Sequence, residues 1–298
     1  MGSILTFSLP YILMLGMSVA GIAESALIKQ YNKKHSNGGF TFIALVSFAS
    51  MLFFLFKYII TDAEKADFTI AVLPYSIVAG LFYASASVLT FYALRYGPLA
   101  ITSLILSYGI VLVAGYGILF LGETATPITY IAFAAILCSL FLIRPKEEAG
   151  EKKAVTAKWL ICVTLSVIFA SGYSIVLRMQ QEVFSNTVTN ECMVIALGIS
   201  AVGTLIAGLI TSGKDALRIL KTGAPYALIA GCANGLNNTL HLFLNTMMAV
   251  SISAPTSSIL KTAVSFAYSY VVLKERFLLR QIIGIIIGAA AVVLMNIA

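Results

Sequence analysis

The stretch of sequence that decides the fold is residues 233–272, ANGLNNTLHLFLNTMMAVSISAPTSSILKTAVSFAYSYVV. It contains two consecutive apolar segments, and both carry polar side chains. In the second, Lys261 follows Ile259 and Leu260, and a lysine at membrane depth costs at least about 2.5 kcal/mol. In the first, the polar residues occupy positions i, i+3, i+4, i+7 and i+11, which share one helical face: Asn234, Asn237, Asn238, His241 and Asn245. The stretch therefore predicts a polar cavity inside a membrane protein; a hydrogen-bonded network that joins two helices is the alternative.

Composition favours a polytopic membrane protein. Of the 298 residues, 60% are hydrophobic and 10% are charged, whereas soluble domains are about 25% charged. The net charge of +7 comes from basic residues in short loops between apolar segments, so we expect no nucleic-acid partner. The four cysteines have no metal-ligand spacing, so we predict neither a metal site nor a cofactor. No HExxH, P-loop or GxSxG motif is present, and we predict no enzymatic activity.

Apolar segments long enough to cross a membrane recur along the whole chain. A transmembrane helix needs about 20 mostly apolar residues, and all spans must be helical because lipid satisfies no backbone hydrogen bonds. These two rules predict an all-α protein with ten spans, at residues 8–30, 40–60, 70–95, 98–121, 126–144, 157–180, 190–212, 223–248, 251–273 and 278–297.

The two halves of the chain repeat each other. Pro74, Tyr75 and Gly80 correspond to Pro225, Tyr226 and Gly231, and Lys29 corresponds to Arg178. We predict an N-terminal five-helix repeat at residues 1–145, a hydrophilic linker at 146–156 and a C-terminal five-helix repeat at 157–298. Because five is an odd number, the second repeat must lie inverted in the membrane, an arrangement found in many secondary transporters.

The chain resembles the drug/metabolite transporter superfamily, in its ten-span EamA-like branch. The resemblance rests on Tyr92-Ala93-Leu94-Arg95-Tyr96-Gly97-Pro98-Leu99-Ala100, on Leu121-Gly122-Glu123, on Lys274-Glu275 and on the five-plus-five layout. It implies a secondary carrier that works by alternating access around a central cavity between the halves, in a bacterial plasma membrane. It also implies that both termini lie inside the cell. The lysines and arginines are concentrated in the loops on the side of the membrane opposite to the termini. The positive-inside rule therefore predicts that both termini lie outside the cytoplasm.

Two positions depart from the patterns of related branches. Small multidrug-resistance proteins keep a glutamate within their first span; this chain has Gly21 there, and its own Glu24 comes one helical turn later. Many EamA-like proteins have Glu-Pro where this chain has Lys261-Thr262. In other branches a lysine in this region serves an anionic substrate, so the resemblance implies a solute with a negative group.

The candidate substrate-binding residues are Lys261, Glu24, Asn234, Asn237, Asn238, His241, Tyr83 and Ser87. Lys261 would bind a carboxylate or phosphate, although an ion pair with Glu24 is the structural alternative. Glu24 is either a proton carrier or an interfacial residue. The asparagine amides both donate and accept hydrogen bonds, and His241 is either a ligand or a packing residue. Tyr83 and Ser87 offer a different chemistry from the first half.

These features predict a secondary active transporter of a small organic metabolite, with an anionic or zwitterionic solute favoured. A proton-coupled exporter of cationic drugs or amines, which would depend on Glu24, and a passive channel are the alternatives. The expected partners are the solute, the lipid bilayer and a coupling proton or counter-substrate, and the chain is expected to be a monomer or a homodimer.

Overall fold

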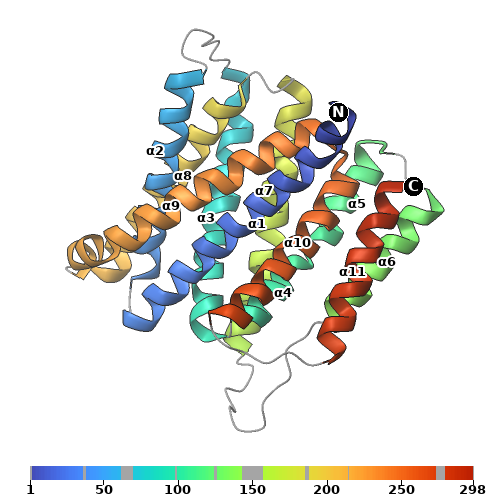
Figure 1. Ribbon diagram of the computed structural model, residues 1–298. Helices are drawn as coiled ribbons and strands as arrows, with labels where there is room; N and C mark the ends of the chain where they lie inside the picture. The colour runs from blue at the N-terminus through green and yellow to red at the C-terminus, as the bar shows by residue number, and fades with distance from the viewer. Residues whose placement is uncertain are drawn as a thin grey trace.

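The computed structural model describes residues 2–35, 38–61, 70–97, 99–123, 126–142, 157–184, 188–213, 215–272 and 279–297. Every described element is a helix, as predicted. The elements are α1 (Gly2–Lys34), α2 (Gly39–Thr61), η2 (Ile70–Val72), α3 (Leu73–Tyr96), α4 (Leu99–Ser107), α5 (Ile110–Phe120), α6 (Pro127–Leu142), α7 (Ala157–Phe184), α8 (Thr189–Ser212), α9 (Asp215–Met247), α10 (Val250–Val271) and α11 (Leu279–Ile297). Figure 1 shows the helices as one bundle with both ends of the chain at the same side.

Eight of the ten predicted spans each coincide with one helix, and the third, at 70–95, takes in η2 and α3. The fourth, at 98–121, is divided: α4 ends at Ser107 and α5 begins at Ile110. Within the break, the amide of Tyr108 donates to the Ile105 carbonyl over 3.0 Å and that of Gly109 to the Leu106 carbonyl over 3.2 Å, a tighter turn than an α-helix. The predicted linker at 146–156, Pro98, Lys274 and Glu275 lie outside the described residues.

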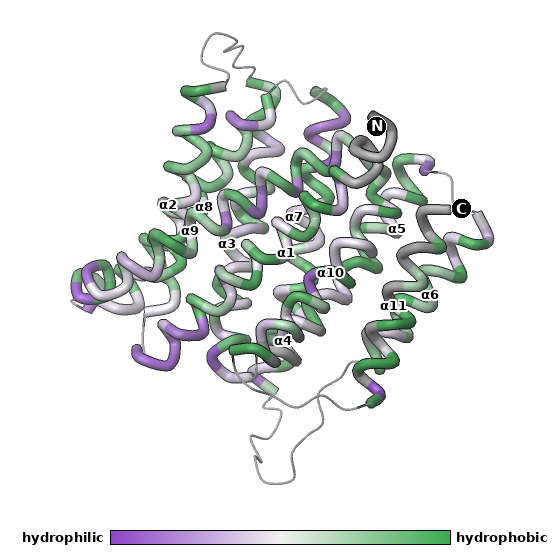
Figure 2. The backbone as a smooth tube through the Cα atoms, viewed as in Figure 1, coloured by the Kyte–Doolittle hydropathy of each residue, from purple (hydrophilic) through white to green (hydrophobic). Residues whose placement is uncertain are grey.

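Within the described residues, five helices are long and apolar enough to cross a membrane: Leu9–Lys34, Gly39–Ile60, Ile70–Tyr96, Ala157–Phe184 and Thr189–Ser212. Figure 2 shows that hydrophobic residues cover the middle of the helices, while hydrophilic residues gather at several helix ends. The chain is therefore a multi-pass integral membrane protein. The full number of ten spans remains a prediction.

Helices of the first half pack mainly against helices of the second. α1 packs against α9, α3 against α7, α2 against α8 and α9, α3 against α8, and α6 against α11. Two matched glycines allow close approach. A Cβ on Gly80 of α3 would lie 2.6 Å from the Ala196 carbonyl oxygen of α8, and a Cβ on Gly231 of α9 would lie 2.8 Å from the Val46 carbonyl oxygen of α2. Small residues thus set the helix spacing, as they do in membrane bundles.

The GxxxG sequence of Gly284 and Gly288 also packs within the subunit. A Cβ on Gly288 would lie 2.6 Å from Ile259 of α10 and 2.6 Å from Ser139 of α6. This face of α11 is therefore used by α6 and α10, and it is not available as a dimer face.

Candidate functional site

A cavity of about 210 Å³ lies where α4, α5, α7, α9 and α10 meet, and Met17 of α1 also lines it. It contains both the histidine and the lysine of the stretch 233–272. His241 and Leu244 contribute from α9, and Lys261 contributes from α10. The helix break at Gly109 lies in its wall. Non-helical backbone at membrane depth is tolerated where it lines a cavity, and broken helices are typical of transporter binding sites.

Serines supply most of the remaining polar lining. Three of them donate to backbone carbonyls: Ser107 to the Ser103 carbonyl over 2.9 Å, Ser171 to the Gly109 carbonyl over 3.2 Å and Ser258 to the Ser107 carbonyl over 3.1 Å. Ser171 and Ser258 thereby hold α7 and α10 against the break between α4 and α5.

Five other polar side chains of the lining have no hydrogen-bond partner among the described residues. They come from three helices: Ser174 of α7, His241 of α9, and Ser253, Ser257 and Lys261 of α10. Ser253, Ser257 and Lys261 are spaced i, i+4, i+8, so they form one stripe along α10. Five unpaired polar groups around one cavity make it the candidate site for a polar solute.

Glu24 belongs to a separate hydrogen-bonded cluster beside this cavity. The amide nitrogen of Asn234 donates to both carboxylate oxygens of Glu24, over 3.0 and 3.1 Å. The amide oxygen of Asn234 accepts three hydrogen bonds, from Ser50 over 3.1 Å, from Tyr83 over 2.9 Å and from Asn238 over 2.9 Å. This cluster, which we call the Asn234 network, joins α1, α2, α3 and α9. Tyr173 extends it to α7 by donating to the Asn238 amide oxygen over 3.1 Å.

Gly21 lies at the point where the Asn234 network approaches the cavity. A Cβ on Gly21 would lie 3.5 Å from the Asn237 amide oxygen and 3.7 Å from Cε of Lys261. Glu24 is the charged group that acts on Lys261. Within the described residues, however, the two form no ion pair within 4.0 Å. The lysine therefore keeps hydrogen-bonding capacity for a solute, which an ion pair with Glu24, the structural alternative for Lys261, would have used.

The eight predicted site residues thus fall into two groups. Lys261 and His241 line the cavity. Glu24, Tyr83, Asn234 and Asn238 form the Asn234 network, and Ser87 lies one helical turn from Tyr83 with its hydroxyl directed to the same phenol. Asn237 lies between these groups, beside Gly21. The cavity and the hydrogen-bonded network, which the sequence offered as alternatives, are therefore both present side by side.

Sequence reasoning missed Ser174, Ser253 and Ser257. A signal was present, because Ser253, Ser257 and Lys261 share one face of a helix at i, i+4 and i+8. Serines in apolar helices commonly bond to the carbonyl one turn back, as Ser18 does to Met14 over 2.8 Å. Sequence alone therefore does not distinguish a free serine from an engaged one.

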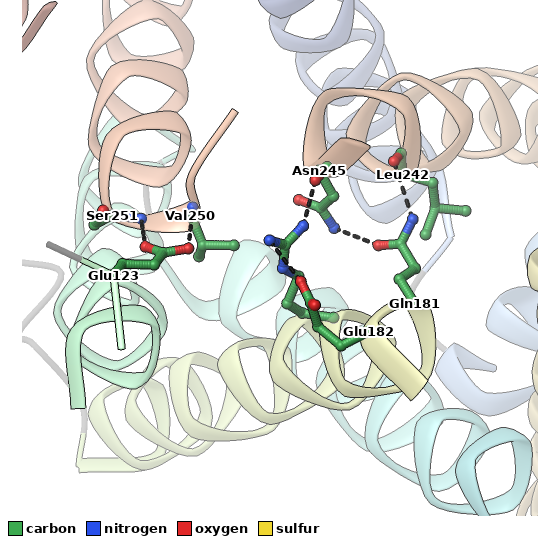
Figure 3. Close-up of polar contacts among 8 residues, drawn as sticks. Glu123, Gln181, Glu182, Leu242, Asn245, Val250 and Ser251 are labelled. Atoms are coloured by element: carbon green, nitrogen blue, oxygen red, sulfur yellow. Dashed lines mark hydrogen bonds and ion pairs between the residues drawn. The ribbon is translucent and has the colours of Figure 1, made fainter. Parts of the chain in front are cut away.

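A second polar cluster, at the end of α9, ties helix ends together (Figure 3). Arg178 donates to the Asn245 carbonyl and pairs with Glu182 at 2.7 Å. Gln181 donates to the Leu242 carbonyl over 3.1 Å and accepts from the Asn245 amide over 2.8 Å. Asn245, predicted on the polar face of α9, therefore serves packing rather than the cavity.

The first half contains the counterpart of this cluster. Lys29 donates to the Leu94 carbonyl, and Asn32 donates to the Phe91 carbonyl over 3.2 Å. The two donors of each cluster are three residues apart: Lys29 and Asn32 in the first half, Arg178 and Gln181 in the second. The residues whose carbonyls accept are also three apart: Phe91 and Leu94 in the first half, Leu242 and Asn245 in the second. The sequence correspondence of Lys29 with Arg178 thus has a matching three-dimensional contact in each half.

Glu123 binds the start of α10. Its two carboxylate oxygens accept hydrogen bonds from the backbone amides of Val250 and Ser251, both over 2.8 Å (Figure 3). The first amides of a helix lack partners within the helix and carry partial positive charge, so a carboxylate is well suited to this position. The Leu-Gly-Glu ending of the predicted fourth span therefore positions the helix that carries Lys261.

Comparison with known proteins matches the first half of the chain to a family. The model of the EamA-like transporter family matches residues 8–144. A chain from a solved crystal structure of a protein aligns with 94% of this chain and 96% of its own, with a TM-score of 0.64 and 13% identity. That likeness shows a shared fold alone. A search of curated proteins finds no match. Residues 8–144 are therefore similar to a family of membrane transporters, which is not a family of enzymes.

Proposed function

We propose that the chain is a secondary active transporter that moves a small organic metabolite, anionic or zwitterionic, across a membrane by alternating access. The observation that carries the proposal is the cavity in which five unpaired polar side chains of α7, α9 and α10 converge around Lys261. The match of residues 8–144 to a transporter family supports it independently.

The matched contacts of the two halves support alternating access between two inverted repeats. The repeats place α1, α2 and α3 in correspondence with α7, α8 and α9. The α1–α9 contact then corresponds to the α7–α3 contact, and the α2–α9 contact corresponds to the α8–α3 contact. The clusters of Lys29 and Arg178 correspond in the same way. A cavity at the interface of such repeats is where transporters bind their solutes.

The size of the cavity favours a metabolite over a drug. Pockets that enclose drug-sized ligands measure about 300–1,000 Å³, and this one measures about 210 Å³. The alternative, a proton-coupled exporter of cationic drugs or amines, would depend on Glu24. Both oxygens of that carboxylate are bound by Asn234, which favours the reading based on Lys261.

Counterflow in proteoliposomes tests the proposal. Vesicles preloaded with an unlabelled metabolite extract should accumulate labelled solutes of that extract transiently and saturably. A passive channel would let the solute equilibrate without counterflow, and that result would overturn the proposal. Lys261→Met should abolish counterflow and Glu24→Gln should retain it; the reverse result would establish the cation exporter.

A further inference from the structure

The chemistry of the cavity wall restricts the chemical class of the solute further than the proposed function does. Four of the five unpaired groups are neutral and can donate a hydrogen bond: three serine hydroxyls and the imidazole of His241. The fifth is the ammonium of Lys261, which only donates. The described lining contains no carboxylate. The wall therefore offers donors and one positive charge, and it offers no negative charge to a cationic group.

The acidic group that acts on this charge does not line the cavity. Glu24 acts on Lys261 through space, and each of its two oxygens accepts a hydrogen bond from the Asn234 amide. The other titratable groups packed against Glu24 and Lys261 are the phenols of Tyr83 and Tyr173 and the imidazole of His241. None of them supplies a negative charge at neutral pH in its ordinary form. A buried ammonium without a hydrogen-bonded counter-ion is costly, and a bound anion removes that cost.

The volume of the cavity suits a small solute. An engineered cavity of about 150 Å³ binds benzene, and the cavity here is about 210 Å³. A solute slightly larger than benzene fits within this volume.

Building on the proposed function, we infer that this cavity binds a small organic oxyanion without an ammonium group, whose charged oxygens lie on the stripe of Ser253, Ser257 and Lys261. Ser174 and His241 face the stripe across the cavity and bind the remaining polar atoms of the solute. Carboxylates and phosphate monoesters share this chemistry. The inference narrows the proposed solute from anionic or zwitterionic to anionic.

A matched series of small probes tests the inference on the purified full-length protein. Lactate and methyl phosphate are the two oxyanions; alanine is the zwitterion, 1-aminopropan-2-ol the cation and lactamide the neutral molecule. Lactate, methyl phosphate or both should raise the unfolding temperature and exchange in proteoliposomes, because ligands that bind the folded state stabilise it. The other three should do neither. A response to only one oxyanion identifies which of the two groups the stripe binds.

Variants assign the effect to the stripe. Lys261→Met should weaken oxyanion binding about ten-fold or more, because hydrogen bonds to charged groups contribute about 1.5–3 kcal/mol. Ser253→Ala combined with Ser257→Ala should weaken it about ten-fold. Ser18→Ala, which removes a hydroxyl already bonded to Met14, should leave binding unchanged. The unfolding temperature of each variant without probe shows that it is folded.

The possible failures can be told apart. Exchange of alanine or the amine, or oxyanion binding unchanged in Lys261→Met, would overturn the oxyanion assignment and leave transport intact. Counterflow of extract solutes without a response to either oxyanion would do the same. Oxyanion binding without any counterflow would retain the site and overturn the proposed function. A protein that neither binds the oxyanions nor supports counterflow would overturn both.

Discussion

At the scale of single residues, Asn234 is the position on which the polar interior depends most. Its amide nitrogen serves both oxygens of Glu24, and its amide oxygen serves Ser50, Tyr83 and Asn238. An amide is the side chain that can donate at one end and accept at the other. The orientation of Asn234 is therefore fixed by its neighbours, with the nitrogen toward α1 and the oxygen toward α2 and α3.

Replacing Asn234 should destabilise the fold strongly. Asn234→Ala removes the donor to the Glu24 carboxylate and the acceptor of the Tyr83 phenol, and each such loss costs about 1–3 kcal/mol. Asn234→Asp should be worse, because it sets a second carboxylate against Glu24. Thermal unfolding in detergent measures the effect. Asn237→Ala is the control, since Asn237 has no hydrogen bond among the described residues. Equal unfolding temperatures for Asn234→Ala and Asn237→Ala would contradict the role given to the network.

At the scale of elements, two glycines at matched positions set the distance between helices of opposite halves. Gly80→Ala and Gly231→Ala should each destabilise the protein by about 1–3 kcal/mol, since an added methyl group meets backbone atoms of α8 or α2 that cannot yield. Gly203→Ala is the control, because a Cβ there meets nothing within 4 Å. Its unfolding temperature should stay unchanged or rise, as alanine favours helix. An equal fall in all three variants would mean that helix spacing is not the cause.

The start of α10 depends on a carboxylate from another element. Glu123→Ala removes the partner of the Val250 and Ser251 amides and should lower stability by about 1–2 kcal/mol, similar to the loss of an N-cap. Glu123→Gln should recover part of the loss, because its amide oxygen still accepts one hydrogen bond. Hydrogen exchange at the first turn of α10 reads this out directly. Protection that is the same in wild type and Glu123→Ala would show that the cap does not hold this turn.

At the scale of the whole molecule, the clusters of Lys29 and Arg178 allow the inverted arrangement to be tested. Figure 1 shows α1 and α7 running in opposite directions, so their last turns lie at opposite ends of the bundle. In a background without the four native cysteines, Gln30→Cys and Glu182→Cys should react with an impermeant thiol reagent from opposite sides of the membrane. Both positions are exposed. Labelling of both from the same side would exclude inverted repeats, and the side that labels Gln30→Cys orients the protein in the membrane.

Much of this architecture follows from the sequence, because apolar segments of sufficient length must be helical in lipid. The polar face of α9 follows from spacing alone. The spacing does not predict which neighbour each residue of this face contacts. Asn234 and Asn238 belong to the Asn234 network, His241 lines the cavity and Asn245 contacts Gln181. Residues on one broad helical face meet different neighbours, and only packing decides which.

The break between α4 and α5 could not be predicted from the sequence for a similar reason. Gly109 is a weak signal beside the apolar residues around it, and no proline marks the position. At the break, Ser171 of α7 and Ser258 of α10 donate to the carbonyls of Gly109 and Ser107. Those partners come from distant segments of the chain, so the local sequence does not record them.

The only tryptophan of the chain has a use in experiment. Trp159 is buried, its indole nitrogen donates to Thr102 of α4 over 3.1 Å, and its ring contacts Gly97 at the end of α3. Indole emission depends on the polarity around the ring. The chain therefore carries one native fluorophore at the seam between α7 and the α3–α4 junction. Any movement of that seam during the transport cycle can be followed by intrinsic fluorescence, without a label.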